Sequence, residues 1–228
     1  MSETTIRNRL FSRIYPGISA KGEERGARGH RKRLLDGLSG EVIEVGAGHG
    51  INFAFYPASV TRLLAVEPED HLRALAEEAA SEAPIPVEVV AGLAEDLPAQ
   101  DASFDAAVAA LVLCTVGDQE RAIAELRRVL RPGGQLRFYE HVVAQHRGAA
   151  RLQRLADATV WPRLAGGCHM GRDTKAAIER AGFTIETVDR FPFSPSPIVP
   201  RTPHLIGTAR NSAPGSLEPK APTGIEPV

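Results

Sequence analysis

Short apolar runs alternate with amphipathic segments along most of the chain. Short, unbroken apolar runs predict β-strands, whereas apolar residues three and four positions apart predict α-helices. Strands are expected at 41–45, 60–67, 87–91, 106–113, 135–143, 183–189 and 203–210. Helices are expected at 22–37, 69–80, 118–130 and 174–181. Strands that alternate with helices across short turns predict an α/β fold with a doubly wound, mostly parallel sheet.

Three segments fall outside this alternation. Residues 1–20 have apolar residues at helical spacing, and Pro16-Gly17 is expected to end that helix. We interpret 1–25 as an N-terminal arm or lid, with a packed helix and a helix on a membrane surface as the alternatives. Residues 146–170 resemble a cap inserted over the carboxyl edge of the sheet. Residues 211–228 contain four prolines and few core-forming residues, which predicts a disordered tail.

The first strand leads into a turn with glycines at alternate positions, Gly46, Gly48 and Gly50. Glycine adopts positive φ without strain and lets a ligand approach the backbone N–H groups. A turn at the carboxyl end of a first parallel strand is where nucleotide-like ligands bind in such sheets. We expect a helix to begin after the turn. The alternative is a tight connection that binds no ligand.

Two acidic positions suit a nucleotide-like ligand. Glu67 ends the second strand, 21 residues beyond Gly46, where a carboxylate can accept hydrogen bonds from ribose hydroxyls. Glu95 or Asp96 follows the third strand and could accept a hydrogen bond from an adenine amino group. A capped surface loop is the alternative for 92–98.

Composition narrows the class of protein further. The chain has 228 residues, of which 43% are hydrophobic and 24% charged, as in a soluble globular domain. The net charge of −1 gives no indication of nucleic-acid binding. The charge is uneven, because residues 1–36 contain nine Arg or Lys residues and only four Asp or Glu residues. A solvated basic surface explains this excess, and attraction to an anionic surface or substrate is the alternative.

The chain has two cysteines, Cys114 and Cys168, which cannot form a disulfide framework. Neither lies in a C-x-x-C pair, so we expect no metal site. Cys114 is interpreted as a small buried hydrophobic residue. We expect a cytoplasmic protein, because the sequence contains no signal-like apolar run and no membrane-spanning stretch.

Four motifs occur in a characteristic order: the glycine turn, the acidic loop at 94–96, Ser103-Phe104-Asp105, and Leu130-Arg131-Pro132-Gly133-Gly134. Together they resemble the class I S-adenosylmethionine-dependent methyltransferases, with the likeness running over about 26–210. The resemblance implies a methyltransferase with S-adenosyl-L-methionine as cofactor. It also implies a Rossmann-like sheet of seven strands whose last strand is antiparallel.

The same resemblance implies roles for individual residues. Glu44, Gly46 and Gly48 would surround the methionine part of the cofactor, and Glu67 would hold the ribose. Ala94 and Glu95 would contact adenine, and Leu113 and Cys114 would lie near the sulfonium.

Further stretches are similar to the methyltransferase-like group that includes membrane-associated alkyl thiol S-methyltransferases. These stretches are 111–116, 128–134, Glu140-His141-Val142, 167–169 and 172–174. The similarity implies a small, apolar methyl acceptor, with a thiol as the leading hypothesis. His141 and His169 are the candidate acid-base or orienting groups, with a structural role as the alternative for each.

Other functions stay open at this point. Within methyl transfer, the acceptor could be a lipid amine or a quinol-like ring, and the basic N-terminal segment leaves peripheral contact with a membrane open. A nicotinamide-dependent oxidoreductase would need its third glycine one position later. A non-catalytic cofactor-binding protein would keep the same binding residues. We expect a monomer or a dimer.

Overall fold

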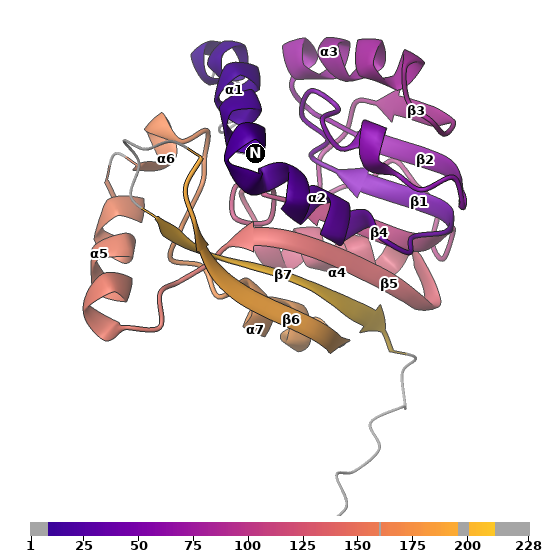
Figure 1. Ribbon diagram of the computed structural model, residues 1–228. Helices are drawn as coiled ribbons and strands as arrows, with labels where there is room; N and C mark the ends of the chain where they lie inside the picture. The colour runs from indigo at the N-terminus through magenta and orange to yellow at the C-terminus, as the bar shows by residue number, and fades with distance from the viewer. Residues whose placement is uncertain (1–8, 160, 196–200, 213–228) are drawn as a thin grey trace, which may run out of the picture.

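The protein is described by a computed structural model that covers residues 9–159, 161–195 and 201–212 (Figure 1). A seven-stranded sheet has the order β3-β2-β1-β4-β5-β7-β6. The strands are β1 Gly40–Val45, β2 Val60–Val66, β3 Val87–Val90, β4 Phe104–Ala110, β5 Leu130–His141, β6 Phe183–Phe193 and β7 Thr202–Asn211. β7 runs antiparallel to β5 and β6, and the other pairs are parallel. The predicted fold class is therefore confirmed. Most of the predicted disordered tail, 213–228, lies outside the described residues.

Helices cover both faces of this sheet and one end of it. They are α1 Arg9–Gly22, α2 Arg28–Leu35, α3 Asp70–Ser81, α4 Gln119–Val129, α5 Arg147–Asp157, α6 Trp161–Leu164 and α7 Thr174–Arg180, with a π-helix at Glu23–Ala27 and a 3-10 helix at Phe53–Phe55. Successive strand residues enter opposite cores: Val42 packs with α2 and α3, whereas Ile43 packs with α4 and α7. A strand buried on both faces explains why its sequence is apolar without alternation.

The N-terminal helix does not end where Pro16 and Gly17 predict. α1 continues through both residues to Gly22. Proline removes one helical hydrogen bond, but side-chain packing stabilises this helix, since Phe11 stacks on Tyr15 with ring centroids 5.3 Å apart. The bend comes later, at Gly26, where φ is 118°.

The prediction of a strand at 106–113 was wrong at the carboxyl end of that strand. β4 ends at Ala110, and Leu111 has a positive φ of 61°. The backbone then turns around Glu140, whose buried carboxylate accepts hydrogen bonds from three successive N–H groups at distances of 2.9 to 3.1 Å: Val112, Leu113 and Cys114. The buried acid on β5 thus replaces sheet partners that the strand would otherwise need.

The predicted boundary between 118–130 and 135–143 also shifts. β5 begins at Leu130, so the Pro-Gly-Gly segment lies inside the strand, at an irregularity in its pairing with β4. β6 extends to Phe193, beyond the predicted end at Asp189. Much of β6 is exposed at the edge of the sheet, which is why its apolar pattern is weak.

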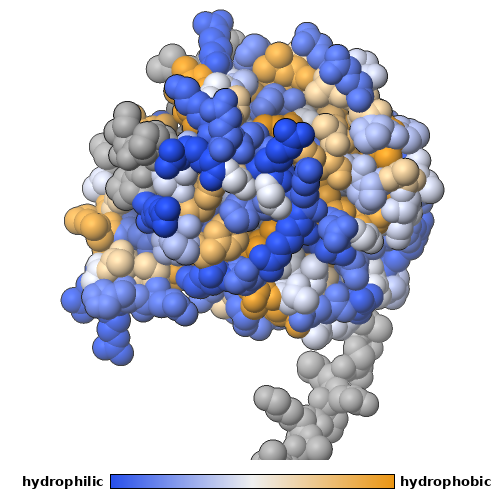
Figure 2. Space-filling view, viewed as in Figure 1, coloured by the Kyte–Doolittle hydropathy of each residue, from blue (hydrophilic) through white to orange (hydrophobic). Residues whose placement is uncertain are grey.

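The helices of the predicted cap, α5 and α6, lie at the end of the molecule toward which β1, β4 and β5 point (Figure 1). Leu152, Leu155 and Leu164 on these helices are exposed by 62 to 70%. Figure 2 shows hydrophobic and hydrophilic residues next to each other on this side. No helix among the described residues is both long and apolar enough to cross a membrane.

Candidate functional site

The glycine turn lies at the carboxyl end of β1. Gly46, Gly48 and Gly50 all have positive φ, at 62°, 60° and 77°. A Cβ atom on Gly46 would lie 2.1 Å from Cγ2 of Val112, so only glycine lets the turn approach the segment after β4 this closely. The helix predicted after the turn is only the three-residue 3-10 helix. The Gly50 N–H group donates to the Ala47 carbonyl at 3.1 Å, which closes the turn on itself.

Glu44 holds the chain that follows this turn in place through buried hydrogen bonds. Its carboxylate is 1% exposed and accepts hydrogen bonds from Asn52 Nδ2 at 2.6 Å and Tyr56 Oη at 2.8 Å. Buried Arg31 donates to Asn52 Oδ1 at 2.9 Å and to Glu23 at 2.7 Å. Burial raises the pKa of Glu44 to about 7, although both hydrogen bonds lower it. The network fixes the segment that follows the glycines.

Glu67 lies next to the glycine turn and is hydrogen-bonded to it. One carboxylate oxygen accepts a hydrogen bond from Gly48 N at 2.8 Å, and the other accepts one from Glu69 N at 2.9 Å. Burial raises the pKa of this carboxyl group, and the two N–H donors oppose that effect. A carboxylate offers about four acceptor positions, so about two remain for hydroxyl donors.

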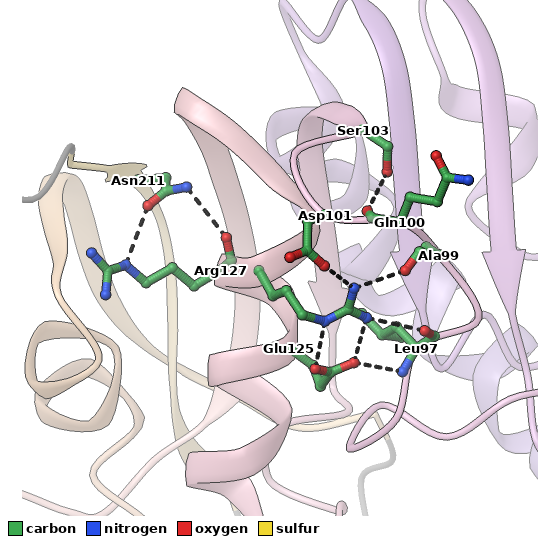
Figure 3. A network of polar contacts seen from close by, with 9 residues as sticks. Leu97, Ala99, Gln100, Asp101, Ser103, Glu125, Arg127 and Asn211 are labelled. Atoms are coloured by element: carbon green, nitrogen blue, oxygen red, sulfur yellow. Dashed lines mark hydrogen bonds and ion pairs between the residues drawn. The ribbon is translucent and has the colours of Figure 1, made fainter.

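The loop with Ala94 and Glu95 is anchored to α4. Glu95 accepts a hydrogen bond from Asp118 N at 3.2 Å, and Arg121 Nε donates to the Glu95 carbonyl at 2.8 Å. Arg128 holds the next residues of the loop by donating to the carbonyls of Leu97 and Ala99 (Figure 3). The acidic loop is thus fixed beside the segment that follows β4.

α1 lies over the glycine turn. A Cβ atom on Gly48 would be 3.5 Å from the Tyr15 ring, and the Tyr15 and His49 rings meet edge to face at 5.7 Å. Phe11, one helical turn earlier, contacts the cap, because a Cβ atom on Gly166 would overlap its ring. Burial raises the pKa of Tyr15. α1 therefore bridges the glycine turn and the cap.

Three segments bring Cys114, His141 and Cys168 together. The two Sγ atoms are 3.7 Å apart, and His141 Nδ1 is 3.6 Å from each of them. Cys114 follows β4, His141 ends the neighbouring β5, and Cys168 comes from the cap. Both cysteines are free and buried. Hydrogen bonding to Cys168 and burial raise the pKa of the Cys114 thiol.

Backbone contacts hold the cap on this cluster. His169 N donates to the Cys114 carbonyl at 2.7 Å, and Arg172 donates to the Leu113 carbonyl at 2.8 Å. Met170 forms a buried cluster with the two cysteines, and Trp161 packs against this cluster. The His169 Nδ1 atom is buried and has no hydrogen-bond partner among the described residues. The predicted residues Leu113, Cys114, His141 and His169 thus lie in one region.

Sequence reasoning missed two parts of this site. It assigned Cys168 no role, because no local spacing connects that residue to Cys114, 54 positions away. It also gave no function to Glu140, whose carboxylate shapes the turn at 112–114. A charged residue at the end of an otherwise apolar strand was the signal for Glu140.

The chain resembles known methyltransferases in sequence and in fold. A family model described as a methyltransferase domain matches residues 43–138. The human "Thiol S-methyltransferase TMT1B" is 35% identical over 180 residues, which cover 77% of this chain and 73% of that protein. The Cereibacter sphaeroides "Phosphatidylethanolamine N-methyltransferase" is 30% identical over 165 residues, covering 71% of this chain and 77% of that protein.

Among solved structures, a Thermotoga maritima S-adenosylmethionine-dependent methyltransferase, titled a possible histamine N-methyltransferase, superposes with a TM-score of 0.66. It is 22% identical and covers 90% of this chain and 99% of that one, which supports the fold. The protein is an S-adenosylmethionine-dependent methyltransferase. More narrowly, it belongs to the methyltransferase family that includes human thiol S-methyltransferase TMT1B.

The residues at the carboxyl edge fit this cofactor. The positive-φ glycines let a ligand approach the backbone of the turn closely, and the remaining acceptor positions of Glu67 suit ribose hydroxyls. The anchored acidic loop suits the amino group of an adenine ring.

Proposed function

We propose that the protein methylates the sulfur of a small, apolar thiol. The supporting observation is the Cys114–His141–Cys168 cluster, which gathers two sulfurs and an imidazole at distances of 3.6 to 3.7 Å, next to the position proposed for the sulfonium of the methyl donor. The similarity to the human thiol methyltransferase covers 77% of the chain, whereas the general family model matches only 43–138. The likeness to a thiol methyltransferase therefore extends beyond the cofactor-binding half.

The cofactor is proposed to lie along the carboxyl edge of β1, β2 and β4. Gly46 and Gly48 would contact its methionine part, with Glu44 holding the turn in position. Glu67 would accept hydrogen bonds from the ribose hydroxyls. Ala94 and Glu95 would contact the adenine ring, and Leu113 and Cys114 would lie beside the sulfonium.

The cofactor supplies a methyl group already activated by a positively charged sulfur. The protein must then align the acceptor with that carbon and exclude water. A thiol is the acceptor that needs least help, since it ionises partly near neutral pH. His141 would hold the acceptor sulfur in its thiolate form, and His169 would orient the acceptor from the cap. Trp161 and Met170 would line the apolar side of the acceptor site.

We further propose that residues 9–22 act as a lid, within an N-terminal arm of 1–25 that precedes a catalytic domain of 26–210. Tyr15 packs on the glycine turn and Phe11 on the cap, so opening α1 would expose both halves of the site together. The cap would be 146–170. Two buried, unpaired cysteines suit a reducing compartment, so we propose the cytoplasm.

The surface of α5 and α6 favours a second class of methyl acceptor, a lipid amine. Exposed Leu152, Leu155 and Leu164 occur on α5 and α6, whose sequences also contain several arginines, and this combination suits peripheral contact with an anionic membrane. A lipid amine could then reach the site, in keeping with the likeness to the Cereibacter sphaeroides enzyme.

The experiment is transfer of labelled methyl groups from S-adenosylmethionine to an alkyl thiol, a lipid amine in vesicles and a quinol, assayed side by side. Label on the thiol alone is the expected result. Label on the lipid amine, or transfer that requires anionic vesicles, would replace the thiol proposal by the second one.

A further inference from the structure

The Cys114–His141–Cys168 cluster has the geometry of a metal site. The ligand atoms of these residues lie within 4.8 Å of one another. In tetrahedral zinc sites the Zn–S distance is about 2.3 Å and the Zn–N distance about 2.0–2.1 Å. Those distances place two sulfurs about 3.8 Å apart, and each sulfur about 3.6 Å from the nitrogen. The cluster has 3.7 Å between Sγ atoms and 3.6 Å from each Sγ to Nδ1.

The fold also holds the three ligands in place. Glu140 fixes the backbone at Cys114, and the His169 N–H bond to the Cys114 carbonyl brings the neighbouring Cys168 to the same point. The His204 ring packs on the His141 ring with centroids 4.2 Å apart, which restrains the imidazole. A site pre-organised in this way needs little rearrangement to bind an ion.

We propose that Cys114, His141 and Cys168 bind one zinc ion whose fourth position takes the sulfur of the acceptor thiol. Two thiolates and one imidazole favour zinc over hard cations such as Mg²⁺. Three protein ligands with one open position are the arrangement of catalytic rather than structural zinc sites. Zinc binding itself follows from the geometry, whereas the role in thiol activation rests on the proposed function.

The chemistry balances without a further reactant. The acceptor thiol loses its proton to water when its sulfur coordinates the ion. Two cysteine thiolates already neutralise the charge of Zn²⁺, so the added thiolate keeps negative charge and nucleophilicity. Its sulfur forms a bond to the methyl carbon of S-adenosylmethionine, and the electron pair of the broken C–S bond stays on the departing S-adenosylhomocysteine. The neutral thioether product is a weaker ligand and leaves.

The first test of this site needs no acceptor. The full-length protein is purified under reducing conditions, freed of metal and titrated with Co²⁺, which reports thiolate coordination through an intense near-ultraviolet charge-transfer band and tetrahedral visible bands. We expect about one ion per chain, displaced by Zn²⁺. Cys168→Ser should weaken binding by about 100-fold or more while thermal unfolding still shows a folded protein. His71→Ala, which removes an exposed histidine on α3, is the matched control and should bind as the original chain does.

Absence of the charge-transfer band, or binding that Cys168→Ser leaves unchanged, would overturn the zinc site. The two proposals fail separately, because Co²⁺ binding is measured without a thiol acceptor. Zinc binding without thiol methylation would disprove the proposed function and leave the metal site. Thiol methylation at an undiminished rate by metal-free protein would disprove the role of zinc in activation.

Discussion

The two halves of the site are built in different ways. The cofactor half consists of the glycine turn and Glu67, which lie close in sequence and are joined by the Gly48 N–H bond to the carboxylate. The acceptor half consists of Cys114, His141 and Cys168, which come from the segment after β4, the end of β5 and the cap. Local motifs specify the first half, and long-range packing assembles the second. Substitutions in the two halves should therefore affect different measurements.

The largest effect expected in the cofactor half is that of Glu67→Ala. Loss of the carboxylate removes the proposed acceptor of the ribose hydroxyls, and hydrogen bonds to charged groups contribute about 1.5–3 kcal/mol. Affinity for S-adenosylhomocysteine, measured by calorimetry, should fall about 100-fold. Glu88→Ala, which removes an exposed acid paired with Arg62, is the control. Unchanged affinity in Glu67→Ala would make the ribose assignment wrong.

Glu44→Gln tests the buried support of the turn. The folded-state pKa of Glu44 is raised from 4.5 to about 7, so the folded protein binds a proton more tightly than the unfolded chain does. That contribution to stability is complete below pH 4.5 and is lost as the pH rises through 7. Glutamine has no proton to lose, so the variant should gain about 2–3 kcal/mol relative to the original chain between pH 4.5 and 8.

Urea unfolding of both proteins across this pH range measures the gap, which is the free energy of unfolding of Glu44→Gln minus that of the original chain. All other titrating groups cancel in this difference. A gap that stays constant, or that narrows with rising pH, would show that Glu44 is not a buried acid of this kind.

Tyr15→Ala tests the bridge between the two halves. Without its ring, α1 no longer covers Gly48, so the cofactor should dissociate faster and its affinity should fall about tenfold, or about 1.4 kcal/mol. Tyr15→Phe should keep most of the affinity, because it keeps the ring. Ile14→Ala is the control on the same helix, since that side chain is 47% exposed. Equal dissociation rates in all four proteins would disprove the lid.

The smallest effect expected is that of Arg128→Met, which releases the acidic loop. Arg128 donates to two loop carbonyls and pairs with Glu125 and Asp101 (Figure 3). Its loss should cost about 1 kcal/mol of stability, with a modest loss of cofactor affinity. Arg127→Met provides the comparison, because Arg127 contacts Asn211 at the end of β7 instead. Equal effects on cofactor affinity would show that the loop anchor is not specific.

The sheet and the cofactor half were largely predictable. Apolar runs locate buried strands, and the glycine turn and Glu67 occur at a fixed spacing because they belong to consecutive strand ends. The end of β4 was not predictable in this way. Leu111–Leu113 continue the apolar run, and only the tertiary contact with Glu140 turns the chain there.

The acceptor half could not be derived from spacing. Cys168 meets Cys114 only because the cap folds back over β4, and no local pattern records that contact. The same holds for α1, which passes through Pro16 because Phe11 and Tyr15 have distant partners. Local rules for helix ends fail where packing outweighs one lost hydrogen bond.

The central claim is that the acceptor atom is sulfur. The most direct measurement compares kcat/KM for an alkyl thiol and for the alcohol of the same chain length, with labelled S-adenosylmethionine as donor. The two acceptors share the same alkyl chain, so contacts with that chain cancel in the comparison and the nucleophilic atom is the difference. The account predicts rapid labelling of the thiol and none of the alcohol. Equal rates, or labelling of the alcohol alone, would contradict it.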